Sequence, residues 1–312
     1  MIPKKWLDSR FIAYFNKAPP SIVCPSFWLL KWSTGCPFHC SYCYLQGTLY
    51  GKKQPRLKDL EEMRRELERF LSWADDSNLE VLLNAGELSD SLAIAPWTNK
   101  LIEILCEVLI RHNGHKVLLV TKGGTKHITP LLTASQNLAD KFIVSFSVNS
   151  IAAAKKFENG APSPDNRLKA AKILQEQGFE IRLRIDPVIP IANWKTSYLA
   201  LLEKIFTRYE LKPSRITIGT LRGLRKTIRF AKKRDWYQYL KSGEKTGWGL
   251  KPPFNLRIKM YSLLIESIRS YGYKEPIALC KETLEAWQAL RKHLEDPGNP
   301  PQWQNVKCNC TL

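Results

Sequence analysis

The sequence predicts an α/β fold built on a parallel sheet, followed by a C-terminal segment of different character. Two observations support this class. Strand-like and helix-like segments alternate six times between residues 26 and 221, and the strands are apolar runs of the kind that helices cover. This succession implies right-handed crossovers in a sheet that either opens flat or curls into a partial barrel. The 312 residues suffice for one large barrel domain or for two ordinary domains.

The first three units share one pattern, an apolar run followed by a segment with helical spacing. The first strand, SFWLLKW, is short and aromatic and leads into a cysteine-rich loop. Its helix, LKDLEEMRRELERFL, carries apolar residues on one face and charges on the other. The predicted elements are strands over 26–32, 79–86 and 115–124 and helices over 57–71, 97–110 and 129–139.

The next three units continue the pattern up to residue 221. The helix after the fourth strand has the start signal SPD before it and Gly178 after it, which is a typical stop signal. Pro187 lies near the end of the fifth strand. The predicted elements are strands over 142–149, 180–190 and 215–221 and helices over 165–177 and 197–209.

The composition changes after residue 221. The stretch 222–254 is dense in Arg and Lys, with aromatic residues between them. We expect a helix over 258–271, a short strand over 276–280, a last helix over 282–293 and an irregular tail. The chain therefore divides into an N-terminal arm (1–25), a sheet domain (26–221) and a C-terminal basic and aromatic extension (222–312) that completes the substrate side.

Charge is the strongest bulk signal. Lys and Arg number 48 against 29 Asp and Glu, a net charge of +19 that attracts polyanions, so nucleic acid is the expected partner, although many proteins are basic for solubility alone. The chain has no apolar signal segment and no run near the roughly 20 residues of a membrane helix. We therefore expect a cytoplasmic protein, in which eight cysteines serve as metal ligands or buried thiols rather than as disulfides.

Three of the eight cysteines lie within GCPFHCSYCYLQGTLYG, where Cys36, Cys40 and Cys43 have the spacing C-x3-C-x2-C. A structural zinc site needs four protein ligands, and a fully ligated iron–sulfur cubane needs a fourth cysteine. No second pair completes either site, because Cys308 and Cys310 lie far away along the chain. Three thiolates on one tight loop suit a [4Fe–4S] cluster whose fourth iron stays open for a small ligand.

With an aromatic residue beside the third cysteine, this motif resembles the radical S-adenosylmethionine (SAM) superfamily. The resemblance implies a partial (β/α)6 barrel of the TIM type with a C-terminal extension, and SAM bound at the open iron. It also implies that SAM is split to a 5′-deoxyadenosyl radical that abstracts hydrogen from substrate, with a flavodoxin or ferredoxin-type electron donor. His39, inside the loop, is expected at the surface or beside the ligands rather than as a ligand.

The segments around the motif resemble spore photoproduct lyases more specifically. The similarity runs in order from Ser26 to Trp287 through AGELSDSL, VTKGG, FIVSFSVN, RLRIDPVIP, ITIGTLR, RIKMYSLLIESIR and IALCKETLEAW. That family repairs a methylene-bridged thymine dimer in DNA by abstracting hydrogen from C6 of the lesion. A lesion must leave the base stack to be processed, and the aromatic residues of 222–254 would suit stacking against such a base. The alternative is that these aromatics pack inward.

The resemblance also implies the SAM-binding positions. Lys122 suits the carboxylate of SAM, and short polar side chains at strand ends suit its ribose and amino group. Arg184 and Asp186 alternate on one strand face, where Asp186 is expected in a structural Arg–Asp ion pair and Arg184 is kept as a SAM candidate. The predicted cofactor-binding residues are Tyr44, Ser89, Asp90, Lys122, Ser147, Asn149 and Arg184.

One position departs from the family. Its lyases carry a cysteine, two residues before the Ser-Asp pair, that returns a hydrogen atom to the product radical, whereas this chain has Glu87. A carboxylate has no weak S–H bond, so we predict a divergent member with a different substrate or a different quenching route. Tyr42 and Tyr44 are retained at positions linked to radical relay. Cys308 and Cys310 supply a thiol if the tail folds over the barrel mouth, and otherwise belong to a disordered tail.

The remaining cysteines are expected to be structural: Cys280 in the core, and Cys24 and Cys106 as buried thiols. The leading hypothesis is a radical SAM lyase acting on DNA or another nucleic acid. One alternative is a radical SAM enzyme acting on RNA, a nucleotide or a small metabolite. Another is an iron–sulfur protein that binds nucleic acid without radical chemistry.

Overall fold

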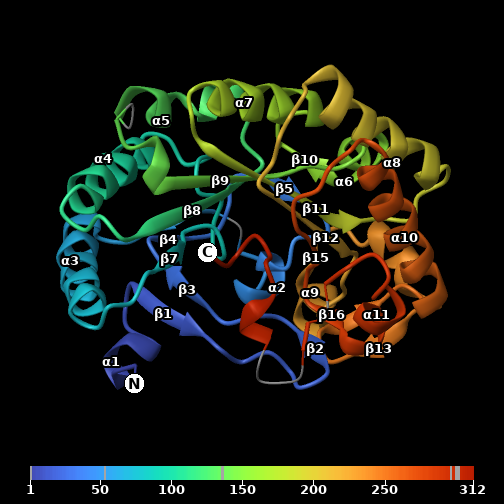
Figure 1. Ribbon diagram of the computed structural model, residues 1–312. Helices are drawn as coiled ribbons and strands as arrows, with labels where there is room; N and C mark the ends of the chain where they lie inside the picture. Colours follow the sequence, from blue (N-terminus) through green and yellow to red (C-terminus); the bar gives the residue numbers. More distant parts are fainter. Residues whose placement is uncertain (1, 53, 135–136, 296, 299–302) are drawn as a thin grey trace.

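A computed structural model of the chain contains one sheet of eight strands, in the order β1-β3-β7-β8-β9-β11-β12-β15 (Figure 1). The structure describes residues 2–52, 54–134, 137–295, 297–298 and 303–312. All neighbouring strands from β3 to β15 run parallel, and β1 pairs with β3 in the antiparallel sense. The strands are β1 (Ile12–Phe15), β3 (Phe27–Leu30), β7 (Leu82–Asn84), β8 (Lys116–Thr121), β9 (Phe142–Ser147), β11 (Glu180–Val188), β12 (Arg215–Thr220) and β15 (Ile277–Leu279).

Six helices connect successive parallel strands and cover the outer face of the curved sheet (Figure 1). In α3 the Asp59 side chain caps the first turn by accepting from the amides of Glu61 and Glu62, while one face is buried. Ser163 caps α7 in the same way, and Gly178 follows it at φ +84°. The helices are α3 (Leu60–Asp76), α4 (Trp97–Leu109), α5 (Thr129–Ala134), α7 (Pro164–Glu176), α8 (Trp194–Glu203) and α10 (Phe254–Ser270).

The two faces of the sheet differ in polarity. Along β11, Ile181, Leu183 and Ile185 belong to the core beneath the helices. Arg184 and Asp186 alternate with them and line a cavity inside the curve of the sheet. The polar side chains of this strand therefore lie inside the partial barrel, where a bound molecule can reach them.

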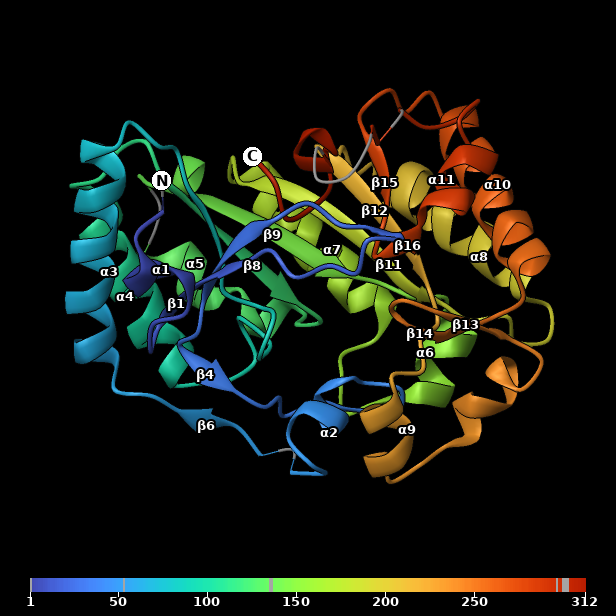
Figure 2. The same ribbon diagram turned by 90° about the horizontal axis from the view of Figure 1, so that it is seen from below.

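Shorter elements complete the fold. The ribbon β5/β10 and the contact between α2 and α9 lie at the end of the sheet that carries the cysteine loop, while the C-terminus lies at the opposite end (Figure 2). No helix of the described residues is long and apolar enough to span a bilayer. The remaining elements are α1 (Lys4–Leu7), β2 (Ile22–Val23), β4 (Ser33–Thr34), β5 (His39–Cys40), α2 (Leu45–Thr48), β6 (Arg56–Leu57), α6 (Ile151–Phe157), β10 (Glu158–Asn159), α9 (Arg225–Phe230), β13 (Glu244–Thr246), β14 (Gly249–Lys251), β16 (Glu282–Thr283) and α11 (Leu284–Ala289).

The six predicted strands up to residue 221 are all present and parallel, as is the strand predicted over 276–280, which extends the sheet as β15. The arm over 1–25 is more integrated than expected, because β1 pairs with β3 and β2 pairs with β16. The helix predicted over 129–139 ends at Ala134, and residues 135 and 136 lie outside the described chain. The tail is irregular as predicted where it is described, over 303–312, apart from one short turn of helix.

Candidate functional site

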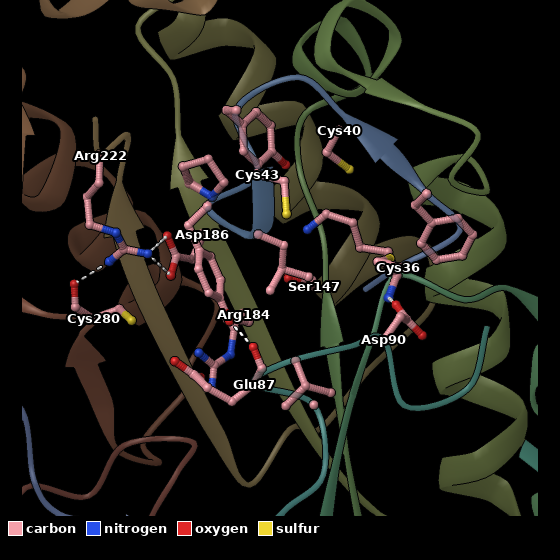
Figure 3. Close-up of a pocket in the computed structure, with 18 of the residues that line it drawn as sticks. Cys36, Cys40, Cys43, Glu87, Asp90, Ser147, Arg184, Asp186, Arg222 and Cys280 are labelled. Carbon is pink, nitrogen blue, oxygen red and sulfur yellow. Dashed lines mark hydrogen bonds and ion pairs between the residues drawn. The ribbon is translucent and has the colours of Figure 1, made fainter. Parts of the chain in front are cut away.

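A cavity of about 410 Å³ opens at the carboxyl ends of the parallel strands (Figure 3). This volume lies within the usual range for ligand pockets, roughly 300–1,000 Å³. Its walls come from the cysteine loop and from the segments that follow β7, β8, β9, β11, β12 and β15. Carboxyl ends of parallel strands are where α/β barrels place their ligands. The sequence-predicted residues that line it are Cys36, Cys40, Tyr42, Cys43, Tyr44, Glu87, Ser89, Asp90, Lys122, Ser147 and Arg184.

The cysteine loop is held in shape by a backbone bond to a neighbouring segment and by the side chain of Gln46. Gly35, at φ +91°, turns the chain into the loop, and its amide donates to the carbonyl of Leu88 at 2.9 Å. The buried Gln46 amide donates to the carbonyls of Cys40 (3.2 Å) and Ser41 (2.7 Å). These contacts make the loop a preorganised support for the three thiols.

The three thiols face the same cavity but do not form a compact single-ion site. Among the described residues, no group of three or more His, Cys, Asp or Glu side chains is placed to hold one metal ion. A cubane cluster makes a different demand, because each thiolate binds its own iron. Burial raises the pKa of the Cys36 thiol and raises that of Cys40 to about 12, so bound metal is needed to keep these thiols deprotonated.

Behind the cysteine loop, the carboxylate of Glu158 contacts Tyr42 and Lys122, two site residues that nothing in the sequence connects. Its carboxylate accepts from the Tyr42 hydroxyl, forms an ion pair with Arg167 at 2.6 Å and lies 3.9 Å from the Lys122 ammonium. Burial raises the pKa of Glu158, but the charges of Lys122 and Arg167 outweigh it and lower the pKa to about 2. Asn149 also donates to Glu158, at 3.2 Å. Glu158 lies in the segment after α6, which has no motif in the sequence, so nothing there pointed to it.

Asn149 is fully buried and does not line the cavity. Its amide group bonds Glu158, the Pro187 carbonyl and the Tyr198 hydroxyl. It therefore supports the cavity wall from behind in this structure, and a direct contact with SAM stays a prediction.

Asp90 links two neighbouring turns at the cavity edge. It accepts from the Thr121 hydroxyl at 2.7 Å, the Lys122 amide at 2.7 Å and the Leu92 amide at 3.0 Å. These bonds fix the turn that presents Lys122 to the cavity. Ser89 and Ser147 line the same wall.

The ion pair expected for Asp186 exists, but its partner is Arg222 rather than Arg184. The Arg222 guanidinium contacts both carboxylate oxygens, at 2.7 and 2.6 Å, and donates to the Cys280 carbonyl at 2.8 Å. A side chain at Gly219 would collide with Asp186, because an added Cβ would lie 2.6 Å from its oxygen. Arg184 instead donates to the Cys310 sulfur at 3.2 Å, and its buried Nε has no hydrogen-bond partner.

Glu87, the position that departs from the family, forms an ion pair with Lys281 at 2.9 Å. Burial raises the pKa of Glu87, but the Lys281 charge outweighs it and keeps the pKa below its usual value. The Lys281 ammonium also lies 4.8 Å from the Trp248 ring. The Tyr44 hydroxyl donates to the Glu87 carbonyl, so the radical-relay candidate and the departing residue are in direct contact.

Four thiols line a second, smaller cavity of about 30 Å³. Its wall shares Glu87, Arg184 and Lys281 with the larger cavity. Cys280, expected in the core, borders both cavities, because the chain leaves β15 at the carboxyl edge of the sheet and turns inward there. Its place as the last residue of the strand predicted over 276–280 was the available signal. The four thiols are Cys24, Cys280, Cys308 and Cys310.

Neither alternative expected for the tail is found in its described part. That part is ordered, but it does not fold over the barrel mouth. Asn309 is fully buried inside the sheet, where its side chain bonds the hydroxyls of Thr217 (2.7 Å) and Ser145 (2.8 Å) and the Leu183 carbonyl (2.9 Å). Arg182, near the start of β11, donates to the Asn309 carbonyl at 3.1 Å. The tail therefore enters from the amino-terminal ends of the strands, away from the mouth (Figure 2).

Of the aromatic residues in 222–254, some pack inward and Trp248 faces the cavity, so both expected roles are present. Trp236 is fully buried and packs in a core cluster with Phe157. Trp248 lines the large cavity beside Lys281. Sequence reasoning left the two roles open for the stretch as a whole, since local composition does not reveal which ring faces the cavity.

A model of the family described as spore photoproduct lyase matches residues 15–234. A spore photoproduct lyase from a Geobacillus species is 28% identical over 198 residues, which cover 63% of this chain and 54% of that protein. The chain thus spans about half the length of the curated relatives it matches.

Two solved structures are similar in fold. One is a spore photoproduct lyase complexed with dinucleoside spore photoproduct, with TM-score 0.66, 22% identity, and 87% of this chain and 79% of that chain covered. The other is a mutant of that enzyme with bound AdoMet and dinucleoside spore photoproduct, with TM-score 0.62, 22% identity, and 80% and 74% covered. At these identities the likeness establishes the fold, a partial barrel of the predicted class.

Proposed function

The chain belongs to the spore photoproduct lyase family, and from this premise we propose that it is a radical SAM enzyme acting on nucleic acid. One observation carries the proposal: three thiols with C-x3-C-x2-C spacing and a set of cationic and short polar side chains line a single cavity at the carboxyl ends of the strands. The relatives are named for their action on the spore photoproduct, so a thymine lesion in DNA is the first substrate to test.

The residues present fit a [4Fe–4S] cluster and SAM. Cys36, Cys40 and Cys43 would hold three irons, and their loop is braced by Gln46. When bound, the cluster supplies an electron that converts SAM into methionine and a 5′-deoxyadenosyl radical. The buried Nε of Arg184 has no hydrogen-bond partner, and buried donors are normally paired. This supports the binding of a ligand at this wall of the cavity.

The SAM contacts are assigned to the residues that line the cavity. Lys122 is positioned by Asp90 on one side and Glu158 on the other, so its ammonium is ready to meet a carboxylate. Ser89 and Ser147 offer hydroxyls to the ribose and amino group, and Tyr44 packs alongside. Arg184 adds a second cation at the far end of the same cavity.

The return of a hydrogen atom to the product radical is assigned to a thiol other than that of the family. Glu87 has no S–H bond and is neutralised by Lys281. Cys280 lies next to Lys281 in the chain and lines the same cavity, so its S–H is the thiol within reach of a substrate there. Hydrogen transfer would leave a sulfur radical on Cys280, and we assign its reduction or relay to Tyr44 and Tyr42, which line the same cavity. Cys310 and Cys308 lie behind Cys280 in the smaller cavity and could replenish it.

A nucleic-acid substrate is supported by charge and by the cavity rim. The net charge of +19 attracts phosphates, and Tyr44 and Trp248 offer aromatic faces for a base removed from the stack. The proposed location is the cytoplasm, since no disulfide joins the cysteines in the described part of the chain and three of them are assigned to a cluster.

The test is an anaerobic reaction of the reconstituted protein with SAM, dithionite and an oligonucleotide containing the spore photoproduct. One chromatogram reports repaired dithymidine and 5′-deoxyadenosine. Both products are expected. Deoxyadenosine without repair would move the substrate to RNA, a nucleotide or a small metabolite. If neither product forms with any nucleic acid, the protein would be an iron–sulfur protein that binds nucleic acid without radical chemistry.

A further inference from the structure

The cysteine loop has a second face, turned away from the substrate cavity. In the ribbon formed by β5 and β10, Cys40 pairs with Glu158 and His39 pairs with Asn159. Alternate residues of a strand point to opposite sides. Cys40 is accordingly buried and lines the cavity, with Glu158 buried beside it in the ribbon, while His39 and Asn159 line a separate hollow on the other side. The ribbon is thus a wall one strand thick between the two spaces.

This outer hollow has a volume of about 880 Å³ and is strongly basic. The side chains of Lys52, Arg56, Lys232 and Lys233 line it, and all four are exposed. In the part of the chain that the structure describes, none of the four takes part in an ion pair, and no carboxylate lines the hollow. Four cations without counter-charges create a local field that favours an anionic partner.

The wall also contains a polar group without a partner. Ser41 lines the hollow, is only 3% exposed, and its hydroxyl has no hydrogen-bond partner. Buried hydroxyls are normally paired, so this one is available to a group that enters from outside. Ser41 lies between Cys40 and Tyr42, directly behind the thiols assigned to the cluster.

We propose that this basic hollow, lined by His39, Ser41, Lys52, Arg56, Lys232 and Lys233, is the docking site of an acidic electron-donor protein of the flavodoxin or ferredoxin type. The proposal rests on the proposed function, since it names the partner of the same cluster. One electron leaves the reduced flavin or iron–sulfur centre of the donor and reduces the cluster held by Cys36, Cys40 and Cys43, and the donor is oxidised by one electron. The ribbon that carries Cys40 lies between this hollow and the cavity whose cysteines would hold the cluster.

Nucleic acid fits this hollow less well than an acidic protein does. The hollow lies on the opposite side of the ribbon from the cavity assigned to the substrate. Single-stranded nucleic acid is usually held by aromatic stacking as well as by charge. No Phe, Tyr or Trp lines the hollow within the described chain, whereas Tyr44 and Trp248 line the substrate cavity.

The experiment compares two variants of the full chain that each lose four positive charges. The first carries Lys52→Gln, Arg56→Gln, Lys232→Gln and Lys233→Gln. The matched control carries Lys259→Gln, Lys274→Gln, Arg291→Gln and Lys292→Gln, four exposed positions on the C-terminal part of the chain. The readouts are the Kd for a bacterial flavodoxin, the Kd for single-stranded DNA, and 5′-deoxyadenosine formed with either flavodoxin or dithionite as reductant.

We expect the first variant to bind flavodoxin at least about tenfold more weakly than the control variant, because it loses charge pairs at the interface. Its deoxyadenosine rate should fall with flavodoxin and stay unchanged with dithionite, which needs no docking site. Equal flavodoxin affinity in the two variants would overturn the proposal. A selective loss of DNA affinity with unchanged flavodoxin affinity would assign the hollow to nucleic acid instead.

The experiment distinguishes a wrong function from a wrong docking site. If the wild-type protein forms no deoxyadenosine even with dithionite, the proposed function is wrong, while the flavodoxin Kd still reports on the hollow. Iron content and circular dichroism of both variants check that exposed substitutions have left the fold intact. Wild-type affinity for flavodoxin should also fall as salt rises, and a salt-independent Kd would count against docking by charge.

Discussion

Glu158 supports the cysteine loop from behind, by pairing with Cys40 in the ribbon and accepting from Tyr42. Its carboxylate is buried and contacts Tyr42, Arg167 and Lys122. Replacing it in Glu158→Gln should leave Arg167, which is fully buried, without its counter-charge, and should lower the free energy of unfolding by about 3–5 kcal/mol at pH 7. Urea unfolding at pH 7 measures this difference. Loss of less than about 1 kcal/mol would show that the pair is not important for stability.

The same carboxylate predicts a pH dependence. Its folded pKa of about 2 lies below the unfolded value of about 4.3, so its stabilisation is complete above the unfolded pKa and is lost as pH falls towards the folded one. The stability difference between the wild type and Glu158→Gln should therefore shrink between about pH 5 and pH 2. Unfolding curves over this range check it, and a constant difference would contradict the assignment.

Cys280 is the residue that most directly tests the quenching step of the proposed reaction. Cys280→Ser removes the S–H bond that lines the cavity and keeps a small polar side chain there. We expect 5′-deoxyadenosine to form at the wild-type rate, while the yield of repaired dithymidine falls by about tenfold or more.

Cys106→Ser is the matched control for this experiment. Cys106 lies on α4, is half-buried, donates to the Ala134 carbonyl at 3.5 Å and does not line the cavity. It should leave both products unchanged. Unchanged repair in Cys280→Ser would move the donor role to Tyr42, Tyr44 or the tail thiols.

At the scale of elements, the contact between α2 and α9 joins the segment after the cysteine loop to the C-terminal extension. It depends on Gly47, where an added Cβ would lie 2.4 Å from the Thr227 amide nitrogen. Gly47→Ala should push the two helices apart at a cost of about 1–3 kcal/mol and reduce the iron retained after reconstitution.

Gly114→Ala provides the control, since nothing lies within 4 Å of a Cβ added there. Thermal unfolding and iron content, measured on both variants, separate a local packing effect from a general effect of the substitution. Equal iron content in the two would show that the α2–α9 contact does not position the loop.

Elements were predicted well where their signal is local. The cysteine spacing identified the thiols that share the cavity, and apolar runs identified every parallel strand of the sheet from 26–32 to 276–280. The Arg–Asp ion pair expected for Asp186 is present, but its partner could not be read from the sequence. Strand alternation places Arg184 on the same face and says nothing of Arg222, which reaches Asp186 from the turn after β12. Glu158 and Lys281 were missed because their roles arise from contacts across the fold.

At the scale of the whole molecule, the tail completes the interior of the sheet. Asn309 bonds side chains or carbonyls on β9, β11 and β12. Asn309→Ala should leave these buried groups unpaired and lower the free energy of unfolding by about 2–4 kcal/mol. Asn305→Ala, at an exposed position of the same tail, is the control. Thermal melts of both variants measure the effect, and similar melting temperatures would contradict it.

This buried tail could not be predicted from composition. The segment WQNVKCNCTL has no apolar periodicity, and a polar residue such as Asn309 gives no local sign that it will be buried. Its burial is decided by hydroxyls and carbonyls on distant strands, which only the assembled sheet brings together. The same holds for the two roles of the aromatic residues in 222–254, of which Trp236 is in the core and Trp248 is at the cavity.

The buried tail has a consequence for the speed of folding. The partners of Asn309 lie 92, 126 and 164 positions away along the chain. Contacts this distant form slowly, because the entropy of closing long loops must be met before the contacts repay it. The sheet interior will therefore stay hydrated until the tail arrives, and docking of the tail should be the last event in refolding.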